Sequence, residues 1–233
     1  MDGPLVALVT GGNRGIGLEV CRQLAGRGYT VVLGSRDPEK GRRAAATIAG
    51  NRGRVLAWQL DVTSADDIER ARARADEELG RLDALINNAA ALYDTWQRVT
   101  DADLDQVRAA FENNTLGPWR MMRAFLPLLR RSPHPRVVNV SSESGSLGSM
   151  ANETPAYNIS KVALNAVTRM LALELRRDGI LVNSVCPGWV ATEMGGPDGR
   201  PVADGAAGIV WAATLPDNGP TGQFLRDGRP LPW

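Results

Sequence analysis

The stretch LVALVTGGNRGIG, residues 5–17, decides the fold. It begins with a run of apolar residues, the pattern of a strand that is buried on both faces of a parallel sheet. A glycine-rich turn follows, and apolar residues at helical spacing begin directly after it. Strand, glycine-rich turn and helix in this order predict a dinucleotide-binding unit whose pyrophosphate lies at the helix N-terminus. Gly11 permits the tight turn, Gly15 lets the backbone approach the pyrophosphate, and Gly17 allows close helix–strand packing.

The rest of the chain repeats the alternation of strand and helix. Further strands are expected at residues 30–35, 55–60, 82–86, 137–140, 181–185 and near 223–225. No linker, repeat or low-complexity segment interrupts them, so residues 1–233 are predicted to form one domain. The expected fold is α/β, a Rossmann-type doubly wound parallel sheet of about seven strands with helices on both faces. Residues 193–203 are rich in glycine and proline and are predicted to form a flexible substrate flap.

The end of the second expected strand indicates the cofactor. Ser35 and Arg36 stand there, and Arg14 of the glycine-rich turn can point toward them. Two guanidinium groups suit a 2′-phosphate, whereas a 2′-hydroxyl is usually held by a carboxylate. Asp37 is interpreted as the N-cap of the next helix, because Pro38 follows it. The sequence therefore favours NADPH.

Two further features lie beyond the expected carboxyl ends of the strands, where such sheets bind ligands. Tyr157 and Lys161 stand four residues apart at the head of an apolar-periodic run, so they share one face of a helix. A cation near a phenol favours the phenolate. Residues 113–118, Asn-Asn-Thr-Leu-Gly-Pro, interrupt another helical stretch and predict a local irregularity there.

Taken together and in order, these motifs resemble the short-chain dehydrogenase/reductase family in its Tyr-x-x-x-Lys form. The turn NRGIG (13–17), the strand end VVNVSS (137–142), PGWV (187–190) and GQF (222–224) are most similar to its carbonyl reductase branch. Two departures stand out. The family's Asn-Asn-Ala-Gly ends in Ala90 here, and the segment from residue 142 to 157 lacks the long insertion of animal monomeric carbonyl reductases.

The resemblance implies a catalytic set of Asn114, Ser142, Tyr157 and Lys161. Tyr157 would be the proton donor in reduction, and Ser142 would hold the substrate carbonyl oxygen. Lys161 would bond the nicotinamide ribose and lower the Tyr157 pKa. Asn114 would hold a water that links Lys161 to solvent.

The resemblance also implies cofactor contacts. Asp61 and Val62 would contact the adenine, Asn88 the adenine ribose region, and Val190 and Thr192 the nicotinamide amide. The full expected set is Gly11, Asn13, Arg14, Gly15, Ile16, Gly17, Arg36, Asp61, Val62, Asn88, Tyr157, Lys161, Pro187, Gly188, Val190 and Thr192. For the substrate, five apolar side chains on loops, Tyr93, Trp96, Met150, Trp189 and Met194, either form an apolar wall or pack the flap.

Composition narrows the remaining classes of function. A net charge of +1 gives no reason to expect nucleic acid or an anionic membrane as partner. His134 is the only histidine, which disfavours a Ser-His-Asp triad and a metal site. Cys21 and Cys186 each lie in an apolar run and are expected to be buried thiols. Without a signal peptide or a membrane-spanning stretch, a cytoplasmic enzyme is expected.

The expected activity is NADPH-dependent reduction of a ketone or aldehyde to an alcohol, with a small-molecule carbonyl or alcohol as substrate. Alcohol oxidation and a dedicated biosynthetic ketoreduction stay open as alternatives. So does a non-catalytic NADPH-binding sensor or scaffold on the same fold. The sequence leaves the choice between a monomer and a homo-oligomer undecided.

Overall fold

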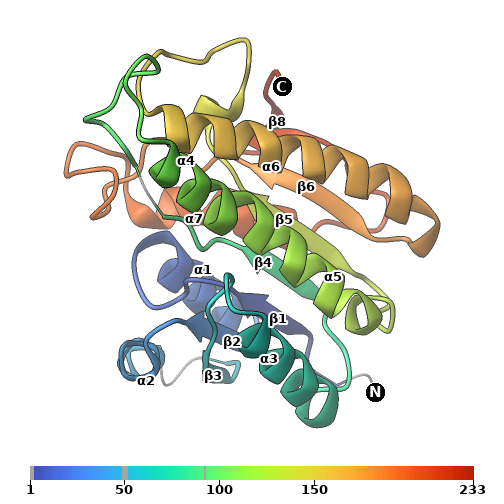
Figure 1. Ribbon diagram of the computed structural model, residues 1–233. Helices are drawn as coiled ribbons and strands as arrows, with labels where there is room; N and C mark the ends of the chain where they lie inside the picture. Colours follow the sequence, from blue (N-terminus) through green and yellow to red (C-terminus); the bar gives the residue numbers. More distant parts are fainter. Residues whose placement is uncertain (1–2, 49–51, 92) are drawn as a thin grey trace.

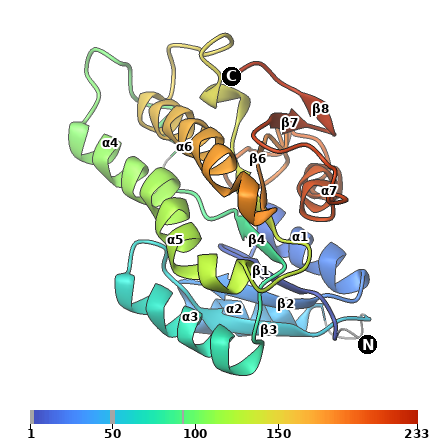
Figure 2. The same ribbon diagram turned by 90° about the vertical axis from the view of Figure 1, so that its right-hand side faces the viewer.

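The computed structural model describes residues 3–48, 52–91 and 93–233, which form one sheet covered by helices on both faces (Figures 1 and 2). Its strands are β1 (Val6–Val9), β2 (Thr30–Ser35), β3 (Val55–Gln59), β4 (Ala84–Asn87), β5 (Arg136–Val140), β6 (Leu181–Val185), β7 (Phe224–Arg226) and β8 (Arg229–Pro230). They lie in the order β3-β2-β1-β4-β5-β6-β7-β8. The predicted doubly wound fold is confirmed, with eight strands instead of about seven.

The additional strand, β8, is the one antiparallel strand among those described. It consists of two exposed residues that pair with β7 across a tight turn. Asp227 and Gly228 form this turn with φ of 50° and 74°. An Asp-Gly pair is a typical signal of such a hairpin, but β8 is too short to show the apolar pattern of a buried strand.

Successive side chains of each central strand enter opposite halves of the core. Val6 and Leu8 of β1 belong to one apolar cluster, and Ala7 and Val9 belong to the other. The first cluster lies under α3 (Ala65–Glu78), α5 (Gly117–Leu129) and α6 (Pro155–Glu174). The second lies under α1 (Gly15–Gly26), α2 (Pro38–Ala46) and α7 (Val202–Ala213). Burial on both faces explains why β1 is apolar at every position.

The predicted helix irregularity is a π-helix. It comprises residues Glu112–Leu116, between α4 (Leu104–Phe111) and α5. The break ends at Gly117-Pro118, where proline lacks an N–H for the helical ladder. A Cβ on Gly117 would lie 2.7 Å from a methyl carbon of Val62, so glycine lets the chain pass close to the strand end after β3. The break buries Asn114 completely.

One predicted helix start and the predicted flap can be compared with the structure. Asp37 caps α2 as predicted, since its carboxylate accepts hydrogen bonds from the N–H groups of Glu39 and Lys40. The predicted flap at 193–203 is a loop only as far as Pro201, because α7 begins at Val202. Backbone bridges join Val190 to Arg200 and Thr192 to Gly196 within this region.

Candidate active site

Glycine shapes the turn between β1 and α1. Gly11 and Gly15 have φ of 63° and 53°, which residues with a Cβ rarely adopt. A Cβ on Gly17 would lie 2.4 Å from both the side-chain nitrogen of Asn88 and the carbonyl oxygen of Gly11. Among the described residues no side chain caps α1, so its first N–H groups can receive an anion.

Asn88 braces this turn from the end of β4. Its Nδ2 donates to the carbonyl oxygens of Thr10 and Gly11 at 2.9 and 3.2 Å. The Thr10 hydroxyl oxygen in turn accepts from the N–H groups of Asn88 and Ala89, each at 3.0 Å. The glycine-rich turn is therefore fixed to the neighbouring strand. The contact of Asn88 with the adenine ribose region stays a prediction.

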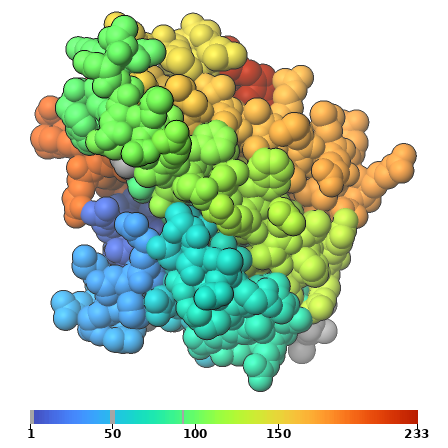
Figure 3. Space-filling view, in the orientation of Figure 1, coloured from blue at the N-terminus to red at the C-terminus, as the bar shows by residue number. Residues whose placement is uncertain are grey.

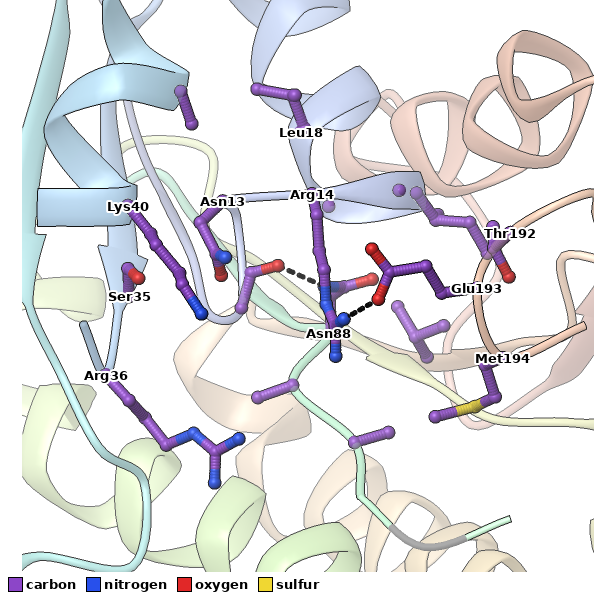
Figure 4. Close-up of a pocket in the computed structure, with 18 of the residues that line it drawn as sticks. Asn13, Arg14, Leu18, Ser35, Arg36, Lys40, Asn88, Thr192, Glu193 and Met194 are labelled. Carbon is purple, nitrogen blue, oxygen red and sulfur yellow. Dashed lines mark hydrogen bonds and ion pairs between the residues drawn. The ribbon is translucent and has the colours of Figure 1, made fainter.

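Positive charge gathers on the cavity beside the turn (Figure 4). Arg36 is exposed at the end of β2, and Lys40 reaches the same side of the cavity from the first turn of α2. Arg14 turns the other way and pairs with Glu193 of the flap. The Ser35 hydroxyl donates to the carbonyl oxygen of Asp37 at 2.8 Å. The cations here match the 2′-phosphate expected from the sequence.

The cavity has a volume of about 710 Å³, within the usual range for cofactor and ligand sites. On the surface it is the hollow between the blue N-terminal part, the orange flap and the green segment above it (Figure 3). An uncapped helix N-terminus suits a pyrophosphate, and the guanidinium and ammonium groups suit a further phosphate. The residues present therefore fit the predicted NADP(H).

Tyr157 and Lys161 lie in the first two turns of α6 and line this cavity. Burial raises the pKa of Tyr157 above its ordinary value, and a hydrogen bond with Ser142 opposes this effect. The phenol therefore stays protonated at neutral pH. Burial lowers the pKa of Lys161 to about 8, and its Nζ lies 5.4 Å from the centroid of the Tyr157 ring. Lys161 is not among the groups that lower the Tyr157 pKa here, so that role stays a prediction.

Asn114 connects the π-helix to α6. Its side chain pairs with the backbone of Ala91 in both directions, accepting from the N–H at 2.8 Å and donating to the carbonyl at 2.9 Å. Its Nδ2 also donates to the Ser160 hydroxyl at 3.0 Å, and that hydroxyl donates to the Tyr157 carbonyl oxygen at 2.7 Å. Asn114 thus reaches the backbone of Tyr157 through one intermediate. Its predicted water stays a prediction.

Most of the residues expected to bind the cofactor line the cavity, namely Gly11, Asn13, Arg14, Gly15, Ile16, Gly17, Arg36, Val62, Asn88, Tyr157, Lys161, Pro187 and Thr192. Asp61, Gly188 and Val190 are not part of the lining. The Asp61 carboxylate accepts from the N–H and the hydroxyl of Thr63, at 2.9 and 2.8 Å. Its contact with the adenine, like that of Val190 with the nicotinamide, stays a prediction.

The five residues expected to contact the substrate fall into two groups. Met194 lines the cavity, and the Tyr93 ring meets the Tyr157 ring edge to face, with centroids 5.2 Å apart. Trp96, Met150 and Trp189 are outside the lining. The Trp189 indole N–H donates to the carbonyl oxygen of Gly195, which supports the alternative that this side chain packs the flap.

The sequence prediction missed three charged residues of the lining, Lys40, Arg43 and Glu193. A signal for Lys40 was present. Asp37 and Pro38 predict where α2 begins, and a cation in the first turn of a helix is disfavoured by the helix dipole. A lysine at that position therefore indicates a task other than helix stability. Glu193 has no comparable signal, because it belongs to a segment without periodicity.

Among residues 3–48, 52–91 and 93–233, no helix is long and apolar enough to cross a membrane. The same residues contain no group of three or more histidine, cysteine, aspartate or glutamate side chains that could hold a metal ion.

The fold and the cavity define a dinucleotide-binding α/β enzyme, and comparison with known proteins gives the family. The family model described as "short chain dehydrogenase" matches residues 5–201. The chain therefore belongs to the short-chain dehydrogenase/reductase family, and it is an oxidoreductase acting on C=O or CH–OH groups, as predicted.

Three relatives illustrate the match. The chain is 33% identical to (+)-neomenthol dehydrogenase of Arabidopsis thaliana, over 95% of this chain and 96% of that protein. It is 32% identical to carbonyl reductase [NADPH] 1 of Mus musculus, over 98% of both. A solved structure of NADPH-bound carbonyl reductase from chicken fatty liver superimposes with a TM-score of 0.88 at 29% identity, covering 100% of each chain. The similarity to the carbonyl reductase branch is confirmed.

Proposed function

We propose that the protein reduces a ketone or aldehyde to an alcohol, with Tyr157 as the proton donor. The observation that carries the proposal is the meeting of Tyr157 and Lys161 with the glycine-rich turn and the basic corner on one cavity. The relatives named for carbonyl reduction support the reaction class. The proposed substrate is a small-molecule carbonyl compound.

NADP(H) is the cofactor. The N-terminus of α1 and the turn at Gly15 would hold its pyrophosphate. Arg36 and Lys40 would hold the 2′-phosphate, and Arg14 would join them on leaving Glu193. When bound, the cofactor supplies the hydride. All other steps fall to side chains of this chain, which position the carbonyl and move a proton.

Proton transfer is the task of Tyr157. Because burial keeps its hydroxyl protonated at neutral pH, it can donate to the carbonyl oxygen as negative charge develops there. Ser142 lies within hydrogen-bonding reach of the Tyr157 hydroxyl, so it can hold the same oxygen. A placed acid typically contributes about 10²–10⁴-fold to the rate, and a donor aimed at the developing charge adds to that.

Lys161 and Asn114 support this step. With a pKa of about 8, Lys161 keeps a large protonated fraction at neutral pH, and it stands four residues from Tyr157 on the same helix. Its positive charge favours the tyrosinate left after proton donation. Asn114 would hold the water that returns a proton to Lys161 from solvent.

A panel of ketones and aldehydes, followed by NADPH absorbance, tests the proposal. Wild-type protein should oxidise NADPH with at least one carbonyl compound, and Tyr157→Phe should lose that turnover while still binding NADPH, because the ring remains and only the hydroxyl is removed. Wild-type-like turnover of Tyr157→Phe would remove the tyrosine from the mechanism. NADPH binding without oxidation across the panel would favour a non-catalytic sensor. Turnover only of alcohols with NADP⁺ would favour oxidation as the physiological direction.

A further inference from the structure

The helix that carries Tyr157 has an unusual beginning. Its N-cap position is Thr154, which has a left-handed φ of 52° and makes no side-chain cap. The Thr154 hydroxyl instead donates to the side-chain oxygen of Asn158 at 2.9 Å. The first N–H groups of a helix need an acceptor when they are buried. For α6 that acceptor comes from elsewhere in the chain.

Asp94 supplies it. One oxygen of its carboxylate accepts from the N–H of Ala156 at 3.0 Å, and the other accepts from the N–H of Tyr157 at 3.1 Å. Asp94 stands 63 residues before Tyr157 in the sequence. It is fully buried, at 0% exposure. A third hydrogen bond, from the side-chain nitrogen of Gln97 at 3.1 Å, completes its environment.

The segment that carries Asp94 also contacts the tyrosine ring. Tyr93, the preceding residue, packs edge to face on the Tyr157 ring at an interplanar angle of 87°. Farther along the segment, Arg98 pairs with Glu153 at 3.1 Å, just before α6 begins. The backbone and the ring of Tyr157 are therefore both held by one segment, that which follows β4.

Capping a helix with a buried carboxylate carries a desolvation cost. Removing a charge from water costs several kcal/mol unless hydrogen bonds replace the lost hydration. A serine or aspartate at position 154 could cap α6 locally, as Asp37 caps α2 and Asp103 caps α4. The cap at α6 differs from these two in that its carboxylate comes from a distant segment, which also places the Tyr93 ring against the ring of Tyr157. This selects a role in placing Tyr157 over a role in helix stability alone.

We propose that Asp94 is a positioning residue of the reaction: its carboxylate fixes the backbone of Tyr157, and with Tyr93 on the ring it sets where the tyrosine hydroxyl stands. The inference rests on the proposed role of Tyr157 as proton donor. Because proton donation depends on placement to a fraction of an ångström, losing this anchor slows the chemical step and leaves the cofactor site intact. The Asp94 carboxylate bonds to Ala156, Tyr157 and Gln97, and Asp94 is not part of the cavity lining.

The test is the first-order rate constant of a single turnover, measured by stopped flow after mixing the enzyme–NADPH complex with a saturating carbonyl substrate from the panel. This rate constant does not depend on how much of the protein is folded. For Asp94→Ala it should fall by about 10–10²-fold, the range expected when a reacting group is displaced by up to about an ångström. Asp94→Asn keeps one acceptor oxygen and should fall less. The NADPH Kd should change less than about threefold in both variants, which corresponds to a change of less than about 0.7 kcal/mol in the binding free energy.

Asp103→Asn is the matched control, because Asp103 caps α4 by accepting from the N–H of Asp105 and lies outside the cavity lining. Its single-turnover rate constant should equal that of the wild type. A wild-type rate constant in Asp94→Ala, with only the amplitude reduced, would show that Asp94 serves folding alone and would overturn the inference. If Tyr157→Phe also turns over normally, the proposed function fails first. If Tyr157→Phe is inactive and Asp94→Ala is normal, only this inference fails.

Discussion

The buried ammonium of Lys161 donates a hydrogen bond to the backbone carbonyl oxygen of Val140 at 2.8 Å. Lys161 is 2% exposed, and Val140 is the last residue of β5, immediately before the two serines of the strand end. The contact fixes α6 to the end of the sheet where the cavity lies. It also leaves a charged group in a desolvated place, which has a measurable consequence for stability.

Stability should rise with pH because of Lys161. Burial lowers its pKa from 10.5 to about 8, so between these values the unfolded chain binds a proton that the folded chain does not, and raising the pH favours folding. Raising the pH through this whole range adds about 3 kcal/mol to the free energy of unfolding, at about 1.4 kcal/mol per pKa unit. The measurement is the free energy of unfolding in urea at about pH 7 and about pH 10, for the wild type and for Lys161→Met. The difference between the two proteins should shift in favour of the wild type at the higher pH, and a constant difference would contradict the prediction.

Ser142 should matter to the reaction far more than its neighbour Ser141. Ser142→Ala removes the hydroxyl that contacts Tyr157, and losing one donor to a developing oxyanion costs about 10²–10³-fold in kcat. Ser141→Ala is the matched control, because its hydroxyl is buried and has no hydrogen-bond partner within the described part of the chain. Steady-state kcat with a panel substrate decides. A larger loss of kcat in Ser141→Ala than in Ser142→Ala would show that Ser141, and not Ser142, holds the carbonyl oxygen.

The fold was predictable because its strands have a simple physical cause. A strand buried on both faces must be apolar at every position, and β1, β2 and β4 are buried throughout. The break before Gly117 was predictable in position, because an Asn-Asn-Thr-Leu-Gly-Pro run disfavours a regular helix. Its π-helical form was not, since that depends on how the chain packs against Val62.

The cavity was predictable where a residue's task is set by its neighbours in sequence. Gly11 and Gly15 require positive φ in a turn that directly follows a strand, and Asp37 caps a helix that begins beside it. Asp94 was not predictable, because its partners are backbone N–H groups 62 and 63 residues away and leave no spacing pattern. The residue types in a sequence do not show which backbone N–H groups bond to a distant side chain.

Arg36 should determine cofactor preference. Arg36→Asp places a carboxylate at the end of β2, where it repels a 2′-phosphate and can accept from a 2′-hydroxyl. The ratio of kcat/KM for NADPH to that for NADH should fall by at least about tenfold, which corresponds to about 1.4 kcal/mol. Arg42→Asp is the control, because Arg42 pairs with Glu39 on α2 and lies outside the cavity lining. If both variants keep the wild-type ratio, the basic corner does not read the 2′-phosphate.

Glu193 competes with the 2′-phosphate of NADPH for Arg14 and should therefore weaken NADPH binding. The two side chains form an ion pair across the cavity (Figure 4), and both are largely exposed, at 63% and 75%. Such pairs are worth about 0.2–1 kcal/mol, so Glu193→Gln should lower the NADPH Kd by about 1.4–5-fold.

Screening makes the effect of Glu193 larger at low salt than at high salt. Isothermal titration of NADPH into each variant at two ionic strengths provides the measurement. Glu69→Gln is the control, because Glu69 pairs with Arg72 on α3, away from the cavity lining. In an Arg14→Gln background Glu193→Gln should have no effect, because the cation for which it competes is gone. A Kd that falls equally in both backgrounds would show that Glu193 acts on the cofactor directly and not through Arg14.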